Sequence, residues 1–186
     1  MNTALLIIDI QNDYFPNGRM ELNDPEQAAT NAAKALTWFR QYNKDNIFHI
    51  QHLAHDPSVG FFLPDTEGAE IHASIAPLAS EDITVKYAPN SFLNTDLEKK
   101  LKEKEVTKLV VVGMMTHMCI DSTVRAAADL GFEVTVLEDA CTTRPLSYDN
   151  IDVSAEQVHY SYMAGIHGVF GKVISTDDFL NQNNNS

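Results

Sequence analysis

Short apolar runs rich in β-branched residues alternate along this chain with longer segments of helical periodicity. The first run covers 4–8, and the most continuous one covers 108–113 (KLVVVG). Continuous apolarity is typical of central strands in a parallel sheet, because helices cover both faces of such a sheet. We therefore predict an α/β protein with a six-stranded, mainly parallel sheet. The other four strands are predicted at 46–53, 82–86, 133–137 and 172–174.

Capping residues predict where the helices between these strands begin. Asp24, followed by Pro25 and Gln27, predicts the start of a helix that runs to about residue 42. Thr116 is predicted to cap a helix at about 118–130, and Ser154 with Gln157 forms a capping-box pattern before another. The segment 55–80 has no helical or strand period, and loops of that length are usually functional.

Composition limits the classes of partner. The 186 residues predict a single domain over 1–180 with a polar tail at 181–186. With 13 Lys and Arg against 26 Asp and Glu, the formal charge is −13, which argues against nucleic acid and anionic membranes as partners. The first apolar run is too short for a signal peptide, and two cysteines are too few for a disulfide scaffold. We therefore expect a cytoplasmic protein.

Three residues that follow or end predicted strands form a chemical set. Asp9 closes the first strand, Lys86 ends the third, and Cys119 follows the fourth. A nucleophilic thiol needs a nearby cation and a group that collects its proton, and these residues supply both. Thr116 as a helix cap would also place Cys119 near the positive end of a helix dipole, which lowers a thiol pKa. Cys141 has no such surroundings and is interpreted as a packing residue.

Taken in order, these segments resemble the isochorismatase-like cysteine hydrolase family. The matching pieces are 9–13 (DIQND), Lys86 with 91–92 (SF), 113–120 (GMMTHMCI), 68–72 (GAEIH) and 138–140 (EDA). The resemblance implies a three-layer α/β/α, Rossmann-like fold that carries an Asp9, Lys86, Cys119 triad. It also implies a cis peptide between Met114 and Met115, and an oxyanion hole made by the N–H groups of Met115 and Cys119. It also implies a small-molecule substrate, no cofactor, and a homo-oligomer, either a dimer or a tetramer.

Within that family, the resemblance favours hydrolysis of an amide or lactam C–N bond through a thioester. Isochorismatases proper cleave a vinyl ether and lack the thiol at the position of Cys119. Vinyl-ether hydrolysis and a catalytically idle binding protein on the same fold are kept as alternatives.

Aromatic residues near the triad are candidates for the substrate pocket. The predicted pocket residues are Tyr14, Phe15, Phe92 and His117. Tyr87 could join them, and Phe61 with Phe62 could form a lid or an interface.

The histidines at 49, 52, 55 and 72 are candidate metal ligands. Nicotinamidases carry an Asp-x-His metal pair after the second strand, whereas 49–55 (HIQHLAH) has no carboxylate, which argues against zinc and nicotinamide. His49 and His52 are expected on opposite faces of a strand, so no metal is predicted. A metal role for His52, His55 or His72 is left open.

Overall fold

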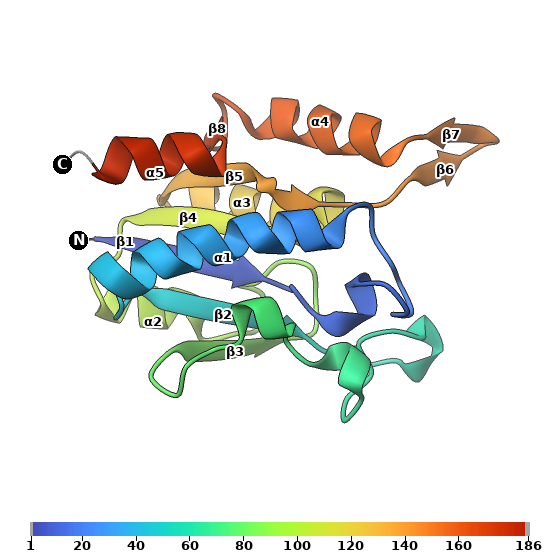
Figure 1. Cartoon of the computed structure of the whole chain (residues 1–186), viewed down its shortest axis with the longest axis horizontal. Coiled ribbons are helices and arrows are strands. Elements are labelled where there is room, and N and C mark those ends of the chain that lie inside the picture. The colour runs from blue at the N-terminus through green and yellow to red at the C-terminus, as the bar shows by residue number, and fades with distance from the viewer. Residues whose placement is uncertain (1, 185–186) are drawn as a thin grey trace.

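A six-stranded parallel sheet forms the centre of the computed structural model, which describes residues 2–184 (Figure 1). Its strands are β1 (Thr3–Ile8), β2 (Ile47–His52), β3 (Asp82–Lys86), β4 (Lys108–Met114), β5 (Glu133–Thr142) and β8 (Lys172–Ile174). They are ordered β3-β2-β1-β4-β5-β8, and every neighbouring pair runs parallel. The predicted three-layer α/β/α fold with a six-stranded sheet is therefore confirmed.

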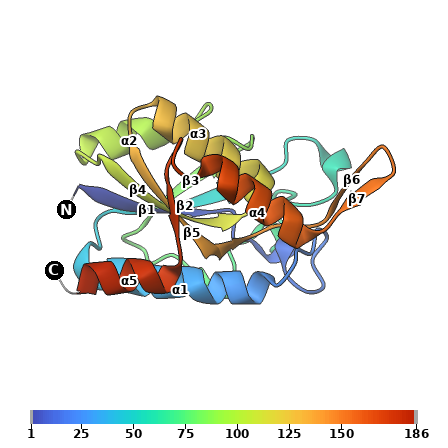
Figure 2. The ribbon, with the colours of Figure 1, turned by 90° about the horizontal axis from the view of Figure 1, so that it is seen from above.

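Helices cover both faces of the sheet (Figure 2). α1 (Pro25–Tyr42) and α5 (Thr176–Asn184) lie on one face, and α2 (Leu97–Glu103), α3 (Asp121–Asp129) and α4 (Ala155–Ile166) lie on the other. Along β1, Leu5 and Ile7 enter the hydrophobic core beneath α1, whereas Leu6 and Ile8 enter the core beneath α2 and α3. Two buried faces explain why β1 is apolar at every position from Ala4 to Ile8.

The predicted helix starts are confirmed at α4 and at α1, which begins at Pro25, but the side-chain cap is found only at α4. The Ser154 hydroxyl accepts a hydrogen bond from the Gln157 N–H at 3.2 Å, and the Gln157 side chain accepts one from the Ser154 N–H at 3.1 Å. The cap predicted at Asp24 is wrong. Asp24 has a left-handed backbone (φ 46°), and its carboxylate accepts a hydrogen bond from the neighbouring Asn23 amide instead of capping the helix.

Three elements in the C-terminal part of the chain, β6, β7 and α5, differ from the prediction. β6 (Leu146–Tyr148) and β7 (Ile151–Val153) form an antiparallel hairpin that projects from the body of the molecule (Figure 1). α5 includes the first part of the predicted tail, where the Asn184 side chain accepts a hydrogen bond from the Trp38 indole at 3.0 Å. Residues 185–186 of that tail lie outside the described residues. None of the described helices combines the length and apolarity needed to cross a bilayer.

The long segment after β2 folds over the carboxyl end of β1. It contains three short 3-10 helices, η2 (Pro57–Val59), η3 (Glu67–Ala69) and η4 (Ala73–Ile75). The buried Asp13 carboxylate accepts a hydrogen bond from the Phe62 N–H at 2.6 Å, and the Ile10 carbonyl accepts one from the His72 N–H at 2.9 Å. These bonds hold the segment against the end of the sheet where the predicted site residues lie.

Candidate active site

The strand order reverses beside β1. The chain builds outward from β1 through β2 to β3, and then returns to place β4 on the other side of β1. In open α/β sheets, ligands bind beyond the carboxyl ends of the strands at such a reversal. Asp9 follows β1, Lys86 ends β3, and Cys119 lies in the turn after β4, so all three meet at this end of the sheet.

Asp9 and Lys86 form a buried ion pair. Their side chains are both 0% exposed, and the Lys86 Nζ lies 2.9 Å from the Asp9 Oδ2. Lys86 also donates a hydrogen bond to the Pro89 carbonyl at 2.7 Å. The other oxygen of Asp9, Oδ1, is buried and has no hydrogen-bond partner in the described part of the chain. Asp9 has a left-handed backbone (φ 52°), a conformation that is uncommon for residues other than glycine.

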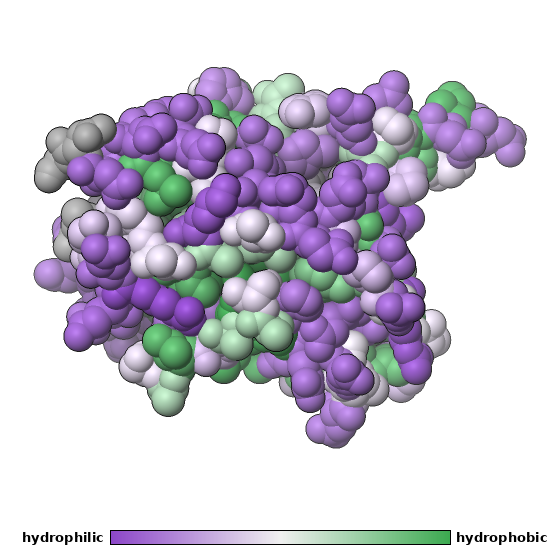
Figure 3. Space-filling view, in the orientation of Figure 1, coloured by the Kyte–Doolittle hydropathy of each residue, from purple (hydrophilic) through white to green (hydrophobic). Residues whose placement is uncertain are grey.

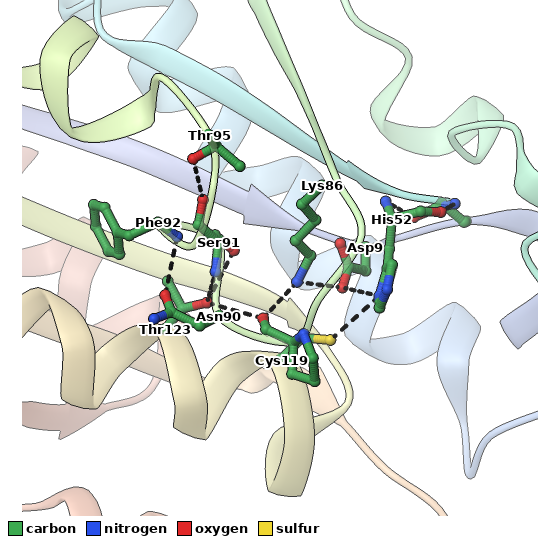
Figure 4. A network of polar contacts seen from close by, with 11 residues as sticks. Asp9, His52, Lys86, Asn90, Ser91, Phe92, Thr95, Cys119 and Thr123 are labelled. Atoms are coloured by element: carbon green, nitrogen blue, oxygen red, sulfur yellow. Dashed lines mark hydrogen bonds and ion pairs between the residues drawn. The ribbon is translucent and has the colours of Figure 1, made fainter. Parts of the chain in front are cut away.

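Cys119 faces this pair together with a fourth residue, His52 (Figure 4). Cys119 is 2% exposed, and its Sγ lies 3.7 Å from the His52 Nδ1, which in turn lies 3.7 Å from the Asp9 Oδ2. One ligand-type atom from each of Asp9, His52 and Cys119 lies within 4.8 Å of the others. The structure therefore brings the three predicted residues together and adds His52, to which sequence reasoning had given no place beside the thiol.

The turn that carries Cys119 differs from the prediction. Residues Thr116–Ile120 form a single π-helical turn, η5, and α3 begins only at Asp121. Thr116 does not cap a helix, because its hydroxyl is within hydrogen-bond distance, 2.9 Å, of the His159 Nδ1. The predicted capping role of Thr116 is therefore wrong.

The surroundings of the site lower the pKa of Asp9 and raise the pKa of Cys119. Burial opposes ionisation of Asp9, but the Lys86 charge and the contact with His52 hold its pKa below the usual value. Burial, reinforced by the negative charge of Asp9, raises the pKa of the Cys119 thiol, and Lys86 only partly offsets this. The predicted lowering of the thiol pKa is therefore wrong, and the resting site holds a thiol beside a carboxylate. Burial also raises the pKa of Cys141, which packs in the core as expected.

The backbone around Met115 is tightly constrained. The peptide bond between Met114 and Met115 is cis. The Met115 carbonyl accepts hydrogen bonds from the N–H groups of Met118 at 3.0 Å and Ile120 at 3.3 Å, so Met115 and Cys119 belong to one turn. Just before it, Gly113 has φ +132° and pairs with Ile8, and a Cβ at Gly113 would overlap the Ile8 carbonyl oxygen. A glycine is required there because β4 and β1 approach each other too closely for a side chain.

Tyr14 and Phe15, two of the predicted pocket residues, both contact aromatic rings. Tyr14 is buried, and its ring centroid lies 4.6 Å from that of Phe62; burial and the nearby charge of Asp9 raise the pKa of Tyr14. Phe15 stacks on His72, with ring centroids 3.7 Å apart.

Two of the predicted pocket residues point elsewhere. The Phe92 ring packs against Phe132 and is directed away from Cys119, so the expectation that it lines the pocket is not met (Figure 4). His117 faces Thr143, with 2.5 Å between Nδ1 and Oγ1, and the ring of Tyr162. Burial and the charge of Arg144 lower the pKa of His117.

A cavity of about 290 Å³ adjoins the site on the side of His52. Its lining is mostly aromatic and aliphatic: His52, Ala54, His55, Asp56, Val59, Phe61, Phe62 and Tyr87. His55 and Tyr87 stack with their ring centroids 4.0 Å apart. The molecular surface in the orientation of Figure 3 is largely hydrophilic, with smaller apolar areas between the polar ones. The apolar lining therefore distinguishes the cavity from much of that surface.

The four histidines that are candidate metal ligands do not lie together. The His49 Nε2 lies 2.9 Å from the buried Glu81 carboxylate, His55 stacks on Tyr87, and the His72 Nδ1 lies 2.8 Å from the Ser74 hydroxyl. His52 alone of these four lies beside Asp9 and Cys119, and those three could offer a metal three ligand atoms. The Lys86 ammonium already contacts the Asp9 carboxylate at 2.9 Å, so this set is poorly suited to a cation.

The chain is similar to one protein family over nearly its whole length. A family model described as an isochorismatase domain matches residues 3–178. The chain is 54% identical over 180 residues to the uncharacterised isochorismatase family protein YddQ of Bacillus subtilis, covering 97% of this chain and 99% of that protein. It is 32% identical to the secreted isochorismatase effector Isc1 of Verticillium dahliae, covering 95% of this chain and 90% of that protein. The crystal structure of an isochorismatase hydrolase from Oleispira antarctica superimposes with a TM-score of 0.91 at 43% identity, covering 96% of each chain.

Proposed function

Because this chain belongs to the isochorismatase family of hydrolases, we propose that it cleaves the C–N bond of a small amide or lactam with Cys119 as nucleophile. The observation that carries the proposal is a buried carboxylate–ammonium pair at the carboxyl end of the sheet, with the sulfur of a buried thiol within 4.8 Å of a carboxylate oxygen. Burying ionisable groups costs folding free energy. Clusters of such groups are typical of functional sites. In this proposal Asp9, Lys86 and Cys119 form the catalytic triad.

Acylation begins with transfer of the thiol proton to Asp9. Its Oδ1 has no other hydrogen-bond partner in the described chain and is free to accept that proton. Lys86 stabilises the thiolate as it forms, and the thiolate attacks the carbonyl carbon of the substrate. Because the pKa of the Cys119 thiol is raised, the thiolate exists mainly while the sulfur attacks the substrate carbonyl.

Collapse of the tetrahedral intermediate completes acylation. Its oxyanion would be held by the N–H groups of Met115 and Cys119, as the family resemblance implies. The C–N bond then breaks, and the proton on Asp9 passes to the departing nitrogen, which leaves as ammonia or an amine. A thioester remains on Cys119 for water to hydrolyse.

The cavity and the net charge narrow the class of substrate. A volume of about 290 Å³ with a mostly apolar lining suits a small molecule with an apolar acyl group. A net charge of −13 makes a neutral or cationic substrate easier to accommodate than a dianion. Assembly as a homo-oligomer in the cytoplasm completes the proposal.

Vinyl-ether hydrolysis is the second candidate, because the relative from Verticillium dahliae is named an isochorismatase. The two activities differ in their products. Amide hydrolysis releases ammonia or an amine, whereas isochorismate hydrolysis releases pyruvate. A catalytically idle protein would release neither.

Substitution of each cysteine in turn tests the nucleophile. We expect Cys119→Ala to abolish ammonia release from a panel of small amides, because the thioester can no longer form. Cys141→Ala is the matched control, since Cys141 is also buried but lies in β5 and does not belong to the group formed by Asp9, His52 and Cys119, and we expect it to retain turnover. Circular dichroism would show that both variants are folded. Full activity in Cys119→Ala would exclude Cys119 as the nucleophile, and pyruvate release from isochorismate without ammonia release from amides would favour the second candidate.

A further inference from the structure

The His52 side chain lies beside Asp9 and Cys119, on the side of Asp9 away from Lys86 (Figure 4). β2 lies between β1 and β3 in the sheet, so the residue that ends β2 lies at the same edge of the sheet as Asp9 and Lys86. The Nδ1 atom of His52 lies 3.7 Å from the Cys119 Sγ and 3.7 Å from the Asp9 Oδ2 (Figure 4). One ring nitrogen therefore faces both the nucleophile and the carboxylate.

The main chain of His52 is held by a buried amide. Gln11 is 0% exposed, and its side chain both donates to the His52 carbonyl and accepts from the His52 N–H, each at 2.8 Å. The same amide nitrogen also donates to the Ala69 carbonyl at 2.9 Å. A side chain with all of these bonds satisfied fixes the strand end, so the His52 ring starts from a defined position.

His52 also links the buried site to solvent. The side chains of Asp9 and Lys86 are 0% exposed and Cys119 is 2% exposed, whereas the His52 side chain is 18% exposed and lines the 290 Å³ cavity. Water that enters from this cavity meets His52 before it reaches the sulfur. The Asp9 carboxylate, by contrast, is 0% exposed, pairs with the Lys86 ammonium at 2.9 Å and does not line the cavity.

We propose that His52 is the general base that activates water for hydrolysis of the thioester on Cys119. This inference rests on the proposed function, because it assigns the second half of the same reaction. The sulfur stays in place after acylation, so the Nδ1 that faces the thiol in the free protein then faces the thioester.

The proton and electron balance of this step is simple. One O–H bond of the water breaks, its proton goes to the His52 Nδ1, and the oxygen forms a bond to the thioester carbon. The C–S bond then breaks with its electron pair on sulfur, and the proton on Nδ1 passes to that sulfur. The products are the carboxylic acid, the Cys119 thiol and neutral His52. While the proton is on Nδ1, the adjacent Asp9 carboxylate stabilises the imidazolium.

The test separates acylation from deacylation with p-nitrophenyl acetate, an activated acyl donor that needs no knowledge of the natural substrate. In the wild-type protein we expect release of p-nitrophenolate at a steady rate. In His52→Asn, which keeps a polar nitrogen near the position of Nδ1 but cannot take a proton, we expect a burst of one equivalent per site. The steady rate after the burst should fall about 100-fold, the scale of a lost general base. Mass spectrometry should then show an acetyl group on Cys119.

Matched variants make the result specific. His167→Gln is the control, because His167 follows α4, is exposed and does not line the cavity, and it should keep the wild-type steady rate. His52→Gln, which has a longer side chain, should also accumulate the acetyl group. A retained burst in either His52 variant shows that its site is folded.

Each outcome decides one of the two proposals. A burst and acetylated Cys119 with a slow steady rate in His52→Asn would support His52 as the deacylation base. A wild-type steady rate in both His52 variants, or loss of the burst together with the steady rate, would overturn that role while leaving Cys119 as the nucleophile. Absence of a Cys119-dependent reaction in the wild-type protein would overturn the proposed function, and the inference with it.

Discussion

Replacing Lys86 with methionine should destabilise the protein strongly at neutral pH. Lys86 and Asp9 are both 0% exposed, so Lys86→Met keeps most of the side-chain volume but leaves the Asp9 carboxylate buried without its cation. Removing one partner of a buried pair typically costs about 3–5 kcal/mol. A domain has only about 5–15 kcal/mol of stability in total, so the change should be large in a urea unfolding experiment.

The pH dependence of this loss follows from the direction of the Asp9 pKa shift. In the wild-type protein the pKa of Asp9 is lowered, so the pair contributes fully above about pH 4 and its contribution is lost as the pH falls through that folded-state pKa. Without Lys86, burial raises the pKa of Asp9 above its unfolded value, and the cost of burying the carboxylate appears as the pH rises. The difference between wild type and Lys86→Met should therefore be greatest near pH 7 and shrink toward pH 4.

Two further variants complete the test. Lys100→Met is the matched control, because the Lys100 side chain is 25% exposed and pairs with Asp82 at 2.9 Å. A partly exposed pair of this kind should cost only about 0–1 kcal/mol. The double variant Asp9→Asn, Lys86→Met should recover part of the loss, since it buries no uncompensated charge. The reasoning is refuted if Lys86→Met loses no more stability than Lys100→Met, or if its loss is the same at pH 7 and near pH 4.

Two further predictions concern the backbone beside the site and the role of metal. Gly113→Ala should lower the unfolding free energy by more than about 1 kcal/mol and reduce activity, because a Cβ would overlap the Ile8 carbonyl and the residue has positive φ. Urea unfolding and turnover would measure both, with Gly131→Ala, which also has positive φ but open space around its Cβ, as the control for φ alone. Prolonged treatment with EDTA should leave turnover unchanged, because the Asp9 carboxylate is neutralised by Lys86 instead of a metal. Loss of activity that added zinc restores would contradict that expectation.

The sequence was most informative about the sheet and the residues at its strand ends. Continuous apolar runs identified the strands, and the ends of parallel strands meet at one edge, so Asp9, Lys86 and Cys119 could be grouped before any contact was known. His52 was missed because its position depends on strand order. Once β2 is known to lie between β1 and β3, the residue that ends β2 must lie at the same edge of the sheet as Asp9 and Lys86. That order is a property of the tertiary fold, and no local pattern specifies it.

Local rules failed where tertiary contacts compete with them. Thr116 is a good capping residue, but its hydroxyl meets His159 instead, and the turn it begins is π-helical. The thiol pKa was predicted from a helix dipole, whereas burial and the charge of Asp9 dominate it.

The β6–β7 hairpin was missed although the sequence carries a signal for it. Asp149 and Asn150 both have positive φ, as a two-residue hairpin turn requires, and residues that favour this conformation stand between two short strands. The strands are only three residues each, too short to show a period by themselves.

The central position of β1 has a consequence for how the molecule acquires its activity. β1 is made first during synthesis, yet one of its two neighbours is β4, which is about a hundred residues further along the chain. Until β4 has joined β1, Asp9 has no thiol beside it and remains solvated at an open sheet edge. Catalytic turnover should therefore appear during refolding only after β4 has paired with β1. A partly assembled chain would contain the same ionisable groups but would not be reactive.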